Sequence, residues 1–392
     1  MSGPRIIDTD THVIEAPDLW TARLPESWGD RRLHIEWDPG RNMEMWCIGD
    51  RRVKPAWSGA AYGRRTDGFE DPPATRDHAH PATWDVTERV KLMDRWGIEM
   101  AVLYPNVAGF TFDPFVDYPD PEVSAAHVSA YNDWLLEWVR CAPGRFIPMM
   151  AVAYWDIPRA TAEVERLTDT GFGGIVTTGA PHQHDLPPLR HPHWEPLWSA
   201  CQDAGLTVSF HVANGDISLE MQPDRLALEG DDIKEARVST ALYLENAKQT
   251  TDLLLSGVLA RFPNLRFAIV ESGMGWVPFV LENVDQRFKR NRVNRQHPEF
   301  GNLLPSDLFR RQVFVNFWFE ELCDFHVERV GIQNLLFETD FPHNTGIYNE
   351  HFEDTLQVAF RSQPDEVRRT ILWDNPARLY GHALAAQGVS VN

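Results

Sequence analysis

The hydrophobic and polar positions of the chain form short apolar runs that alternate with longer stretches of helical periodicity. Eight runs have the length and residue content of buried strands: 5–17, 99–106, 146–154, 174–178, 207–211, 266–271, 313–319 and 335–343. Helical stretches lie between them at 87–96, 122–141, 158–168, 194–204, 242–262 and 277–292. Strands that alternate with helices in this order predict an α/β fold, a (β/α)8 TIM barrel. We expect residues 1–392 to form a single barrel domain.

Two segments interrupt the alternation. Residues 20–81 are rich in Trp, Arg, Pro and Gly, and within them residues 42–48 predict a small β excursion or lid near the N-terminus. Residues 214–240 are polar and follow the strand that ends in His211. Loops at the C-terminal rim of a barrel commonly select the substrate, so both insertions are candidates for covering a site. Surface loops without a functional role, or a contact between copies of the chain, would explain the two insertions equally well.

The first strand carries an unusual set of polar residues at its C-terminal end. Side chains alternate between the two faces of a strand, so Asp8, Asp10 and His12 are expected to point to one side. Taken alone, the Asp residues would equally fit a capped turn, and His12 would fit a satisfied core histidine. Metal coordination is the alternative that also explains why acids and an imidazole gather at the end of an apolar strand.

Three later strands strengthen the metal interpretation, because each ends in a further candidate ligand. His211 ends one strand, Glu271 ends the next, and Asp340 follows the last. A barrel brings the C-terminal ends of its strands together at one rim, where active sites form. The sequence therefore predicts that Asp10, His12, His211 and Asp340 share one divalent cation, with Glu271 as a further candidate ligand.

The net charge, the cysteine pattern and the lack of targeting segments indicate which partners and which cell compartment to expect. The 392 residues carry a formal net charge of −20 and no basic run, which argues against nucleic acid and anionic membrane surfaces as partners. The four cysteines are scattered without a Cys-x-x-Cys pair, so neither a disulfide scaffold nor a zinc ribbon is indicated. Neither a signal segment nor a transmembrane stretch is apparent, and we expect a cytoplasmic protein. A small-molecule substrate fits this composition, and so does a homo-oligomer.

Polar motifs recur in order from Arg5 to about Gly381. They are Asp8-Thr-Asp10-Thr-His12-Val-Ile-Glu15, Lys91-Leu-Met-Asp-Arg-Trp-Gly97, Ala130-Tyr-Asn-Asp-Trp134, Phe210-His211, Arg261-Phe-Pro-Asn-Leu-Arg266, Glu271-Ser-Gly-Met-Gly-Trp276, Glu338-Thr-Asp340-Phe-Pro-His343 and Asn375-Pro-Ala-Arg378. This ordered set resembles the amidohydrolase superfamily, and within it the amidohydrolase-related group that includes aminocarboxymuconate semialdehyde decarboxylase and aromatic acid decarboxylases.

The resemblance implies a metal site in which Asp10 and His12 stand for the first-strand pair, His211 for the fifth-strand histidine and Asp340 for the eighth-strand aspartate. The chain departs from this pattern at two places. Glu271 stands where many relatives have a sixth-strand histidine. The fourth strand ends in Thr177 and Thr178 without a lysine that could become a bridging carbamate. The ordinary carbamate-bridged two-metal site is therefore not expected.

The ligand set and its neighbours leave several roles open. Two imidazoles with several carboxylates form a harder donor set than all-nitrogen sites, so manganese and iron compete with zinc, at one or two ions per chain. Glu271 fits a metal ligand, a general base or a structural acid, and the cost of burying a carboxylate favours a site role. His343 fits a catalytic residue that contacts substrate or orients Asp340, or equally a loop cap. Trp20, Trp276 and Trp318 are candidates for an apolar pocket wall, although large aromatic residues also build cores.

These observations lead to three functional hypotheses. The first is a metal-dependent hydrolase or non-oxidative decarboxylase of a small organic acid or cyclic compound, in which Asp340 or Glu271 shuttles a proton. The second is a non-haem iron or di-iron oxygenase on the same barrel, for which the carboxylate-rich ligand set is the argument. The third, a non-catalytic binding protein, is disfavoured by the complete set of ligand positions.

Overall fold

The computed structural model describes residues 5–62, 72–107, 113–213, 215, 218–347 and 352–389. Residues 63–71 of the first predicted insertion and residues 214, 216 and 217 of the second lie outside these ranges. Among the residues described, no helix combines the length and the apolar content that crossing a membrane requires.

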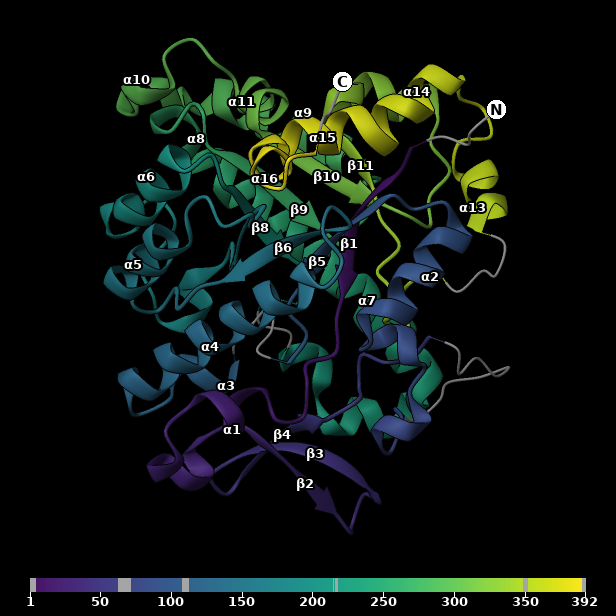
Figure 1. The fold of residues 1–392 in the computed structure, drawn as a ribbon. Helices are drawn as coiled ribbons and strands as arrows, with labels where there is room; N and C mark the ends of the chain where they lie inside the picture. The colour runs from purple at the N-terminus through teal and green to yellow at the C-terminus, as the bar shows by residue number, and fades with distance from the viewer. Residues whose placement is uncertain are drawn as a thin grey trace.

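Eight parallel strands form the centre of the molecule, as predicted (Figure 1). In spatial order they are β1 (Ile7–His12), β5 (Met100–Tyr104), β6 (Phe146–Ala151), β7 (Gly174–Thr177), β8 (Thr207–His211), β9 (Arg266–Val270), β10 (Val313–Phe317) and β11 (Leu335–Phe337). The seam between β11 and β1 closes just beyond β11, where the Asp340 amide donates to the Asp10 carbonyl at 3.0 Å. The sheet is thus a nearly closed (β/α)8 barrel.

Helices overlap all six predicted stretches, but the helix predicted over 242–262 differs at both ends, since it begins at Pro223 and is divided near its C-terminal end. The longer ones are α2 (Val86–Trp96), α4 (Pro121–Arg140), α5 (Ile157–Leu167), α6 (Glu195–Asp203), α7 (Pro223–Leu255), α9 (Val277–Asn291) and α11 (Pro305–Gln312). The predicted helix over 242–262 is divided at Gly257, whose φ of +78° ends the helical path before α8 (Val258–Arg261). The remaining helices are α1 (Leu19–Arg23), α3 (Asp113–Val116), α10 (Val293–Gln296), α12 (Asp324–His326), α13 (Phe352–Ala359), α14 (Asp365–Arg369), α15 (Asn375–Leu379) and α16 (Gly381–Ala386).

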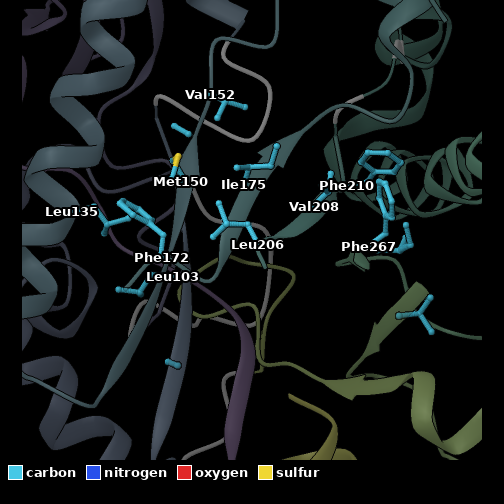
Figure 2. Close-up of a cluster of buried hydrophobic side chains, with 14 of the residues drawn as sticks. Leu103, Leu135, Met150, Val152, Phe172, Ile175, Leu206, Val208, Phe210 and Phe267 are labelled. Carbon is cyan, nitrogen blue, oxygen red and sulfur yellow. The ribbon is translucent and has the colours of Figure 1, made fainter. Parts of the chain in front are cut away.

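Alternating side chains on the strands build two hydrophobic cores. Val102 and Met149 belong to an inner core, which the C-terminal helices α15 and α16 complete through residues such as Leu379 and Leu384. The strand residues that alternate with the inner-core residues, such as Leu103 and Met150, point outward and pack against the helices. Part of this outer core is drawn in Figure 2. Two layers of side chains on opposite faces of each strand are the expected packing of this barrel. The polar residues at the strand ends are therefore held by a rigid frame.

The first insertion contains the predicted β excursion. Strands β2 (His34–Asp38), β3 (Met43–Ile48) and β4 (Arg51–Pro55) form a three-stranded antiparallel sheet. In Figure 1 this sheet lies at the lower end of the molecule, beyond the C-terminal end of β1. The chain after β4 is attached to the loop after β11, because the amides of Ala61 and Tyr62 donate to the Pro342 carbonyl at 3.0 and 3.1 Å.

The second insertion is largely helical. Most of its described residues form the first half of α7, which is kinked at Gly230 (φ 72°, ψ 172°). The second half of α7 reaches the strand ends, where the Asn246 side-chain amide donates to the carbonyl of Val270 at 3.1 Å and to the Ser272 hydroxyl. α7 therefore covers the C-terminal ends of β8 and β9.

Candidate metal centre

Of the polar residues Asp8, Asp10 and His12 on β1, only Asp10 and His12 point into the mouth of the barrel. The carboxylate of Asp8 accepts hydrogen bonds from the amide and hydroxyl of Thr339, at 2.9 and 2.6 Å. The prediction that Asp8 faces the same way as Asp10 and His12 is therefore wrong. The pairing of β1 with β5 shifts in register between Asp8 and Thr11, and such an irregularity breaks the simple alternation of faces. Asp8 fixes the β11 loop rather than joining the centre.

His12 and His211 are buried and oriented with their Nε2 atoms toward Asp10. The Nδ1 atom of His12 lies 3.0 Å from the Pro105 carbonyl, and that of His211 lies 3.3 Å from the Val212 carbonyl. Since a carbonyl only accepts, each imidazole carries its proton on Nδ1 and presents a lone pair at Nε2. Those Nε2 atoms are 3.4 and 3.5 Å from the two carboxylate oxygens of Asp10. Histidine ligands of metals are commonly fixed in this way.

The carboxylate of Asp10 is the clearest sign that a cation belongs here. Within the part of the chain that the structure describes, neither of its oxygens has a hydrogen-bond partner, and the side chain is fully buried. Burial raises its pKa well above the ordinary range, and the neighbouring carboxyls of Asp340 and Glu271 raise it further. Two ligand atoms about 2.1 Å from a tetrahedral metal are about 3.4 Å apart, which matches the spacing between Asp10 and the histidine nitrogens. The donor set therefore fits a divalent cation.

Glu271 and Asp340 face each other across the centre through Thr345. Both acids have left-handed backbone conformations, with φ of +54° and +53°, which is unusual for residues other than glycine and is frequent at functional sites. The Thr345 hydroxyl lies 3.1 Å from Oε1 of Glu271 and also contacts Oδ2 of Asp340. A hydroxyl has a single proton to donate, so a proton retained on one of the two carboxyls would give each of these contacts its own donor. Burial raises the pKa of Glu271 to about 8 and that of Asp340 to about 7.

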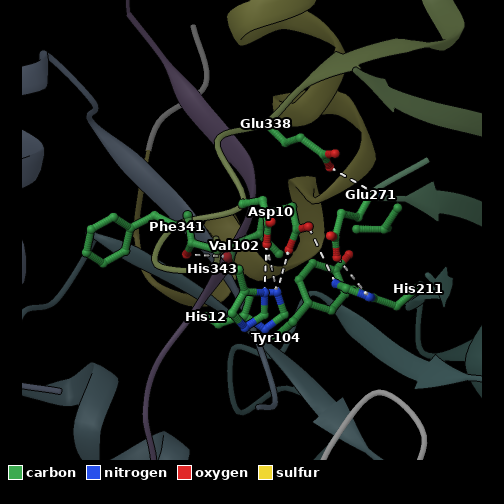
Figure 3. Close-up of polar contacts among 12 residues, drawn as sticks. Asp10, His12, Val102, Tyr104, His211, Glu271, Glu338, Phe341 and His343 are labelled. Carbon is green, nitrogen blue, oxygen red and sulfur yellow. Dashed lines mark hydrogen bonds and ion pairs between the residues drawn. The ribbon is translucent and has the colours of Figure 1, made fainter. Parts of the chain in front are cut away.

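His343 joins the centre from the loop after β11. Its Nδ1 atom is 2.8 Å from Oδ1 of Asp340, and its ring lies 3.9 Å from the ring of His12, centroid to centroid. Burial lowers the pKa of His343 to about 4. The donor atoms form two overlapping groups: Asp10, His12, His211 and Glu271 make one, and His12, Glu271, Asp340 and His343 make the other. Figure 3 shows several of these side chains converging on one point.

Asp8 apart, the candidate ligands and catalytic residues of the sequence analysis lie together at the C-terminal ends of β1, β8, β9 and β11; they are Asp10, His12, His211, Glu271, Asp340 and His343. The sequence grouped Asp340 with Asp10 and both histidines, whereas in the structure Glu271 completes that group. Asp340 remains adjacent, because its Oδ1 lies 3.6 Å from Nε2 of His12.

Sequence reasoning missed a fourth buried acid, Glu338. Its Oε2 accepts from the amide of Glu271 at 3.3 Å, and its Oε1 has no hydrogen bond among the described residues. Burial raises its pKa well above the ordinary range, with further increases from Asp10, Glu271 and Asp340. The motif Glu338-Thr-Asp340 showed that an acid was present, but a strand end alone does not reveal that it reaches the backbone of β9. Glu338 is therefore a further buried acid beside the centre, and its surroundings disfavour its ionised form.

Aromatic side chains form a wall on one side of the carboxyl pair. The ring of Tyr243, on α7, packs against Trp318 and Phe319 with centroid distances of 5.4 and 5.9 Å. Trp318 donates to the Thr345 carbonyl at 2.9 Å, which ties the wall to the residue between Glu271 and Asp340. Burial raises the pKa of Tyr243, and the nearby carboxyls of Glu271 and Asp340 raise it further.

Of the three tryptophans considered as pocket residues, Trp318 lies in this wall. Trp20 is instead fully buried in the outer core, where its indole donates to the His127 carbonyl at 2.9 Å. Trp276 is half-buried and donates to the Ser272 carbonyl at 3.0 Å.

A family model described as amidohydrolase matches residues 7–382, which include every strand of the barrel and every residue of the centre. The chain belongs to the amidohydrolase family. This amidohydrolase is accordingly an enzyme, and the binding-protein hypothesis is set aside. Among proteins with curated descriptions, none matches the chain.

Solved structures share the fold of this amidohydrolase at low sequence identity. An amidohydrolase from Mycobacterium avium subsp. paratuberculosis has a TM-score of 0.74 and 22% identity over 97% of this chain and 100% of its own. The 5-carboxyvanillate decarboxylase of Sphingomonas paucimobilis gives 0.65 and 20% over 97% and 99% of the two chains. A dihydroxybenzoic acid decarboxylase from Polaromonas, solved with manganese and the inhibitor 2-nitroresorcinol, gives 0.63 and 20% over 97% of both chains.

The raised carboxyl pKa values predict that the metal-free amidohydrolase becomes less stable as pH rises. Burial raises the pKa of Asp8 and Asp340 to about 7 and that of Glu271 to about 8, whereas unfolded carboxyls titrate near about 4. The folded state therefore binds more protons than the unfolded state, and the resulting stabilisation is lost as pH rises through these folded values. Buried His12, His211 and His343 have lowered pKa values and act in the opposite direction, mainly below about pH 7.

We therefore expect the free energy of unfolding of the metal-free protein to fall between about pH 7 and about pH 8.5. Urea unfolding at a series of pH values measures this slope. Excess Mn²⁺ should reverse it, because a cation binds the ionised ligands and stabilises only the folded state. A metal-free protein whose stability is constant or rises over this window would contradict the assigned pKa shifts.

Proposed function

We propose that this amidohydrolase is a metal-dependent, non-oxidative decarboxylase of a small planar carboxylic acid. The observation that carries the proposal is the pair Glu271 and Asp340, two acids that share Thr345 and retain protons near neutral pH. In decarboxylation the bond to the carboxyl carbon breaks, its electron pair stays on the remaining carbon, and that carbon takes up a proton. Carbon dioxide leaves. A buried acid that still carries a proton near neutral pH is the group this step requires.

In this proposal the cation is held by Asp10, His12 and His211, with Glu271 or Asp340 completing the set. The unsatisfied carboxylate of Asp10 and the two Nε2 atoms directed toward it support this choice. A mixture of imidazole and carboxylate ligands suits manganese, iron or zinc, and the decarboxylase from Polaromonas was solved with manganese. When bound, the ion would act as a Lewis acid that polarises a substrate oxygen.

The remaining residues of the centre would position the substrate and move the proton. Whichever of Asp340 and Glu271 does not ligate the cation would hold the transferable proton, and Nδ1 of His343 lies 2.8 Å from Oδ1 of Asp340. Tyr243 and Trp318 would pack against the face of a planar substrate, since aromatic faces favour stacked or edge-on partners. The structural neighbours include decarboxylases of benzoic acid derivatives, which supports an aromatic acid.

Hydrolysis is the second candidate, and it rests on the same buried acids and the same family. A carboxyl that can release and recover a proton would serve water attack on a cyclic amide or ester as well as it serves carbon protonation. Oxygen chemistry at an iron centre receives no support from the comparisons and remains an untested alternative.

The test is an assay of the metal-reconstituted protein. The chain is stripped with a chelator and reloaded anaerobically with Mn²⁺, Zn²⁺ or Fe²⁺. It is then incubated with hydroxylated benzoic acids and, separately, with cyclic amides and lactones. We expect metal-dependent release of carbon dioxide, without dioxygen consumption, and incorporation of one deuterium at the vacated carbon in D₂O. Metal-dependent ring opening without carbon dioxide release would replace the proposal with hydrolysis, and substrate-dependent dioxygen uptake would replace it with oxygenation.

A further inference from the structure

Asn106, just after β5, connects three parts of the fold around the metal centre. Its backbone amide donates to Oε1 of Glu15 at 2.8 Å, and its carbonyl accepts from Nζ of Lys54 on β4 at 3.2 Å. Its side-chain Oδ1 lies 3.1 Å from Nε2 of His343. The Glu15 carboxylate is buried and also accepts from the Val107 amide at 2.7 Å, which fixes the backbone on both sides of this contact. Asn106 therefore presents its amide to His343 from a rigid base.

The first insertion closes over this contact at Gly59. A Cβ atom added to Gly59 would lie 2.6 Å from Oδ1 of Asn106 and 3.0 Å from the His343 ring, closer than side chains normally approach. The backbone of the insertion is also hydrogen-bonded to the β11 loop one residue before His343. Glycine at this position lets the insertion press directly on the pair, which leaves the imidazole little room to turn.

We propose that Asn106 is a positioning residue that turns Nδ1 of His343 toward the metal centre, with Gly59 of the insertion holding the pair in place. An imidazole whose Nε2 is hydrogen-bonded to Asn106 must direct Nδ1 toward Asp340, which is where the structure places it, at 2.8 Å. Rotation of the ring by a half turn would replace Nδ1 with a carbon atom. One hydrogen bond, together with steric confinement, suffices to select between two otherwise similar ring orientations.

The proposal deepens the proposed function, since it assigns how His343 is held at the same centre. It gives the insertion a role in positioning a residue of the centre. If Asn106 were purely structural, its substitution would change folding stability alone. If it positions His343, its substitution also changes the surroundings of the bound metal.

The experiment compares Asn106→Ala, Asn106→Asp, Gly59→Ala and His343→Ala in the full-length protein, with Gly381→Ala as the matched control. Gly381 lies in α16 and has no atom within 4 Å of an added Cβ. Asn106→Asp keeps an oxygen that accepts from Nε2, so it should restore most of what Asn106→Ala loses. The thermal midpoint of each metal-free variant separates folding defects from defects of the centre.

Two readouts decide the outcome. We expect Asn106→Ala and Gly59→Ala to lower kcat by roughly ten- to a hundredfold, with KM changed less than about threefold, as is usual for residues that orient others at metal sites. The double variant His343→Ala/Asn106→Ala should be no slower than His343→Ala alone. The visible absorption of the Co²⁺-loaded protein, which requires no substrate, should change alike in Asn106→Ala and His343→Ala and stay unchanged in Gly381→Ala.

An unchanged cobalt spectrum in folded Asn106→Ala would overturn the proposal, as would an additive loss of activity in the double variant. If no substrate is turned over by the wild-type protein, the proposed function fails, but the cobalt spectra still decide the role of Asn106. Should Gly59→Ala not fold, Asn106→Ala and Asn106→Asp decide the question without it.

Discussion

Asp340→Asn is expected to lower kcat by roughly two to four orders of magnitude while the protein stays folded. The substitution keeps the volume of the side chain but removes its charge, its transferable proton and its strength as a metal ligand. Asp340 contacts the Thr345 hydroxyl and lies 2.8 Å from Nδ1 of His343, so its loss affects both routes by which a proton could leave or enter. Turnover of the Mn²⁺-loaded protein, with metal content measured on the same sample, tests this expectation.

Glu163→Gln is the matched control for that experiment. Glu163 is a buried acid on α5 that binds Asn132 and Arg166, outside the group of donor atoms at the centre. The control should lower the thermal midpoint, because it weakens charge-assisted hydrogen bonds, and leave kcat near that of the wild type. If folded Asp340→Asn turned over as fast as the wild type, Asp340 would have no role in the proposed chemistry.

The ligand positions were predictable because they depend on two regularities of the barrel. Apolar runs locate the strands, and parallel strands in a barrel present their C-terminal ends at one rim. His211 and Asp340 could therefore be grouped although they are far apart in the sequence. The chain order of strands and helices was sufficient to predict the barrel for the same reason.

The failures come from local irregularities and from contacts between loops. Asp8 was misplaced because the register shift in β1 changes which side chains share a face, and the sequence shows no sign of it. Asn106 and Thr345 were not recognised because their partners, His343 and the acids Glu271 and Asp340, come from other segments. The start of α7 at Pro223 was missed because its first half is polar and interrupted by Gly230, so it has no clear apolar face.

The centre is unfavourable without a cation, and that property connects its structure to its function. Asp10, Glu271, Glu338 and Asp340 are buried together, and their pKa values are raised by burial and by one another. Burying ionised carboxylates without partners is costly, so the metal-free site must retain protons. Metal binding would displace some of those protons. The affinity for the metal therefore depends on pH, because the ligands must lose protons before they bind the cation.

Glu271→Gln is the second substitution for which we expect a large loss of turnover. Glu271 is also the residue at which this chain departs from the family pattern, since many relatives have a histidine there. Its Oε2 lies 3.8 Å from Nδ1 of His211, and its Oε1 accepts from the Thr345 hydroxyl at 3.1 Å. The glutamine retains a carbonyl oxygen for Thr345 but lacks the charge that a cation or a proton requires. We expect turnover to fall by roughly two to four orders of magnitude, with at least partial loss of metal.

Metal content and activity of this one variant separate the roles open to Glu271. Loss of both, with activity restored by a high concentration of Mn²⁺, identifies a metal ligand whose removal weakens binding. Full metal content with the same loss of turnover identifies a proton-transferring acid that does not ligate the ion. Thr345→Val serves as the control, since it removes the hydroxyl that contacts Glu271 and Asp340 without changing the charge of the centre. If Glu271→Gln keeps both its metal and its turnover, Glu271 is a structural acid, and the carboxylate-rich ligand set on which the case for manganese or iron rests loses one of its members.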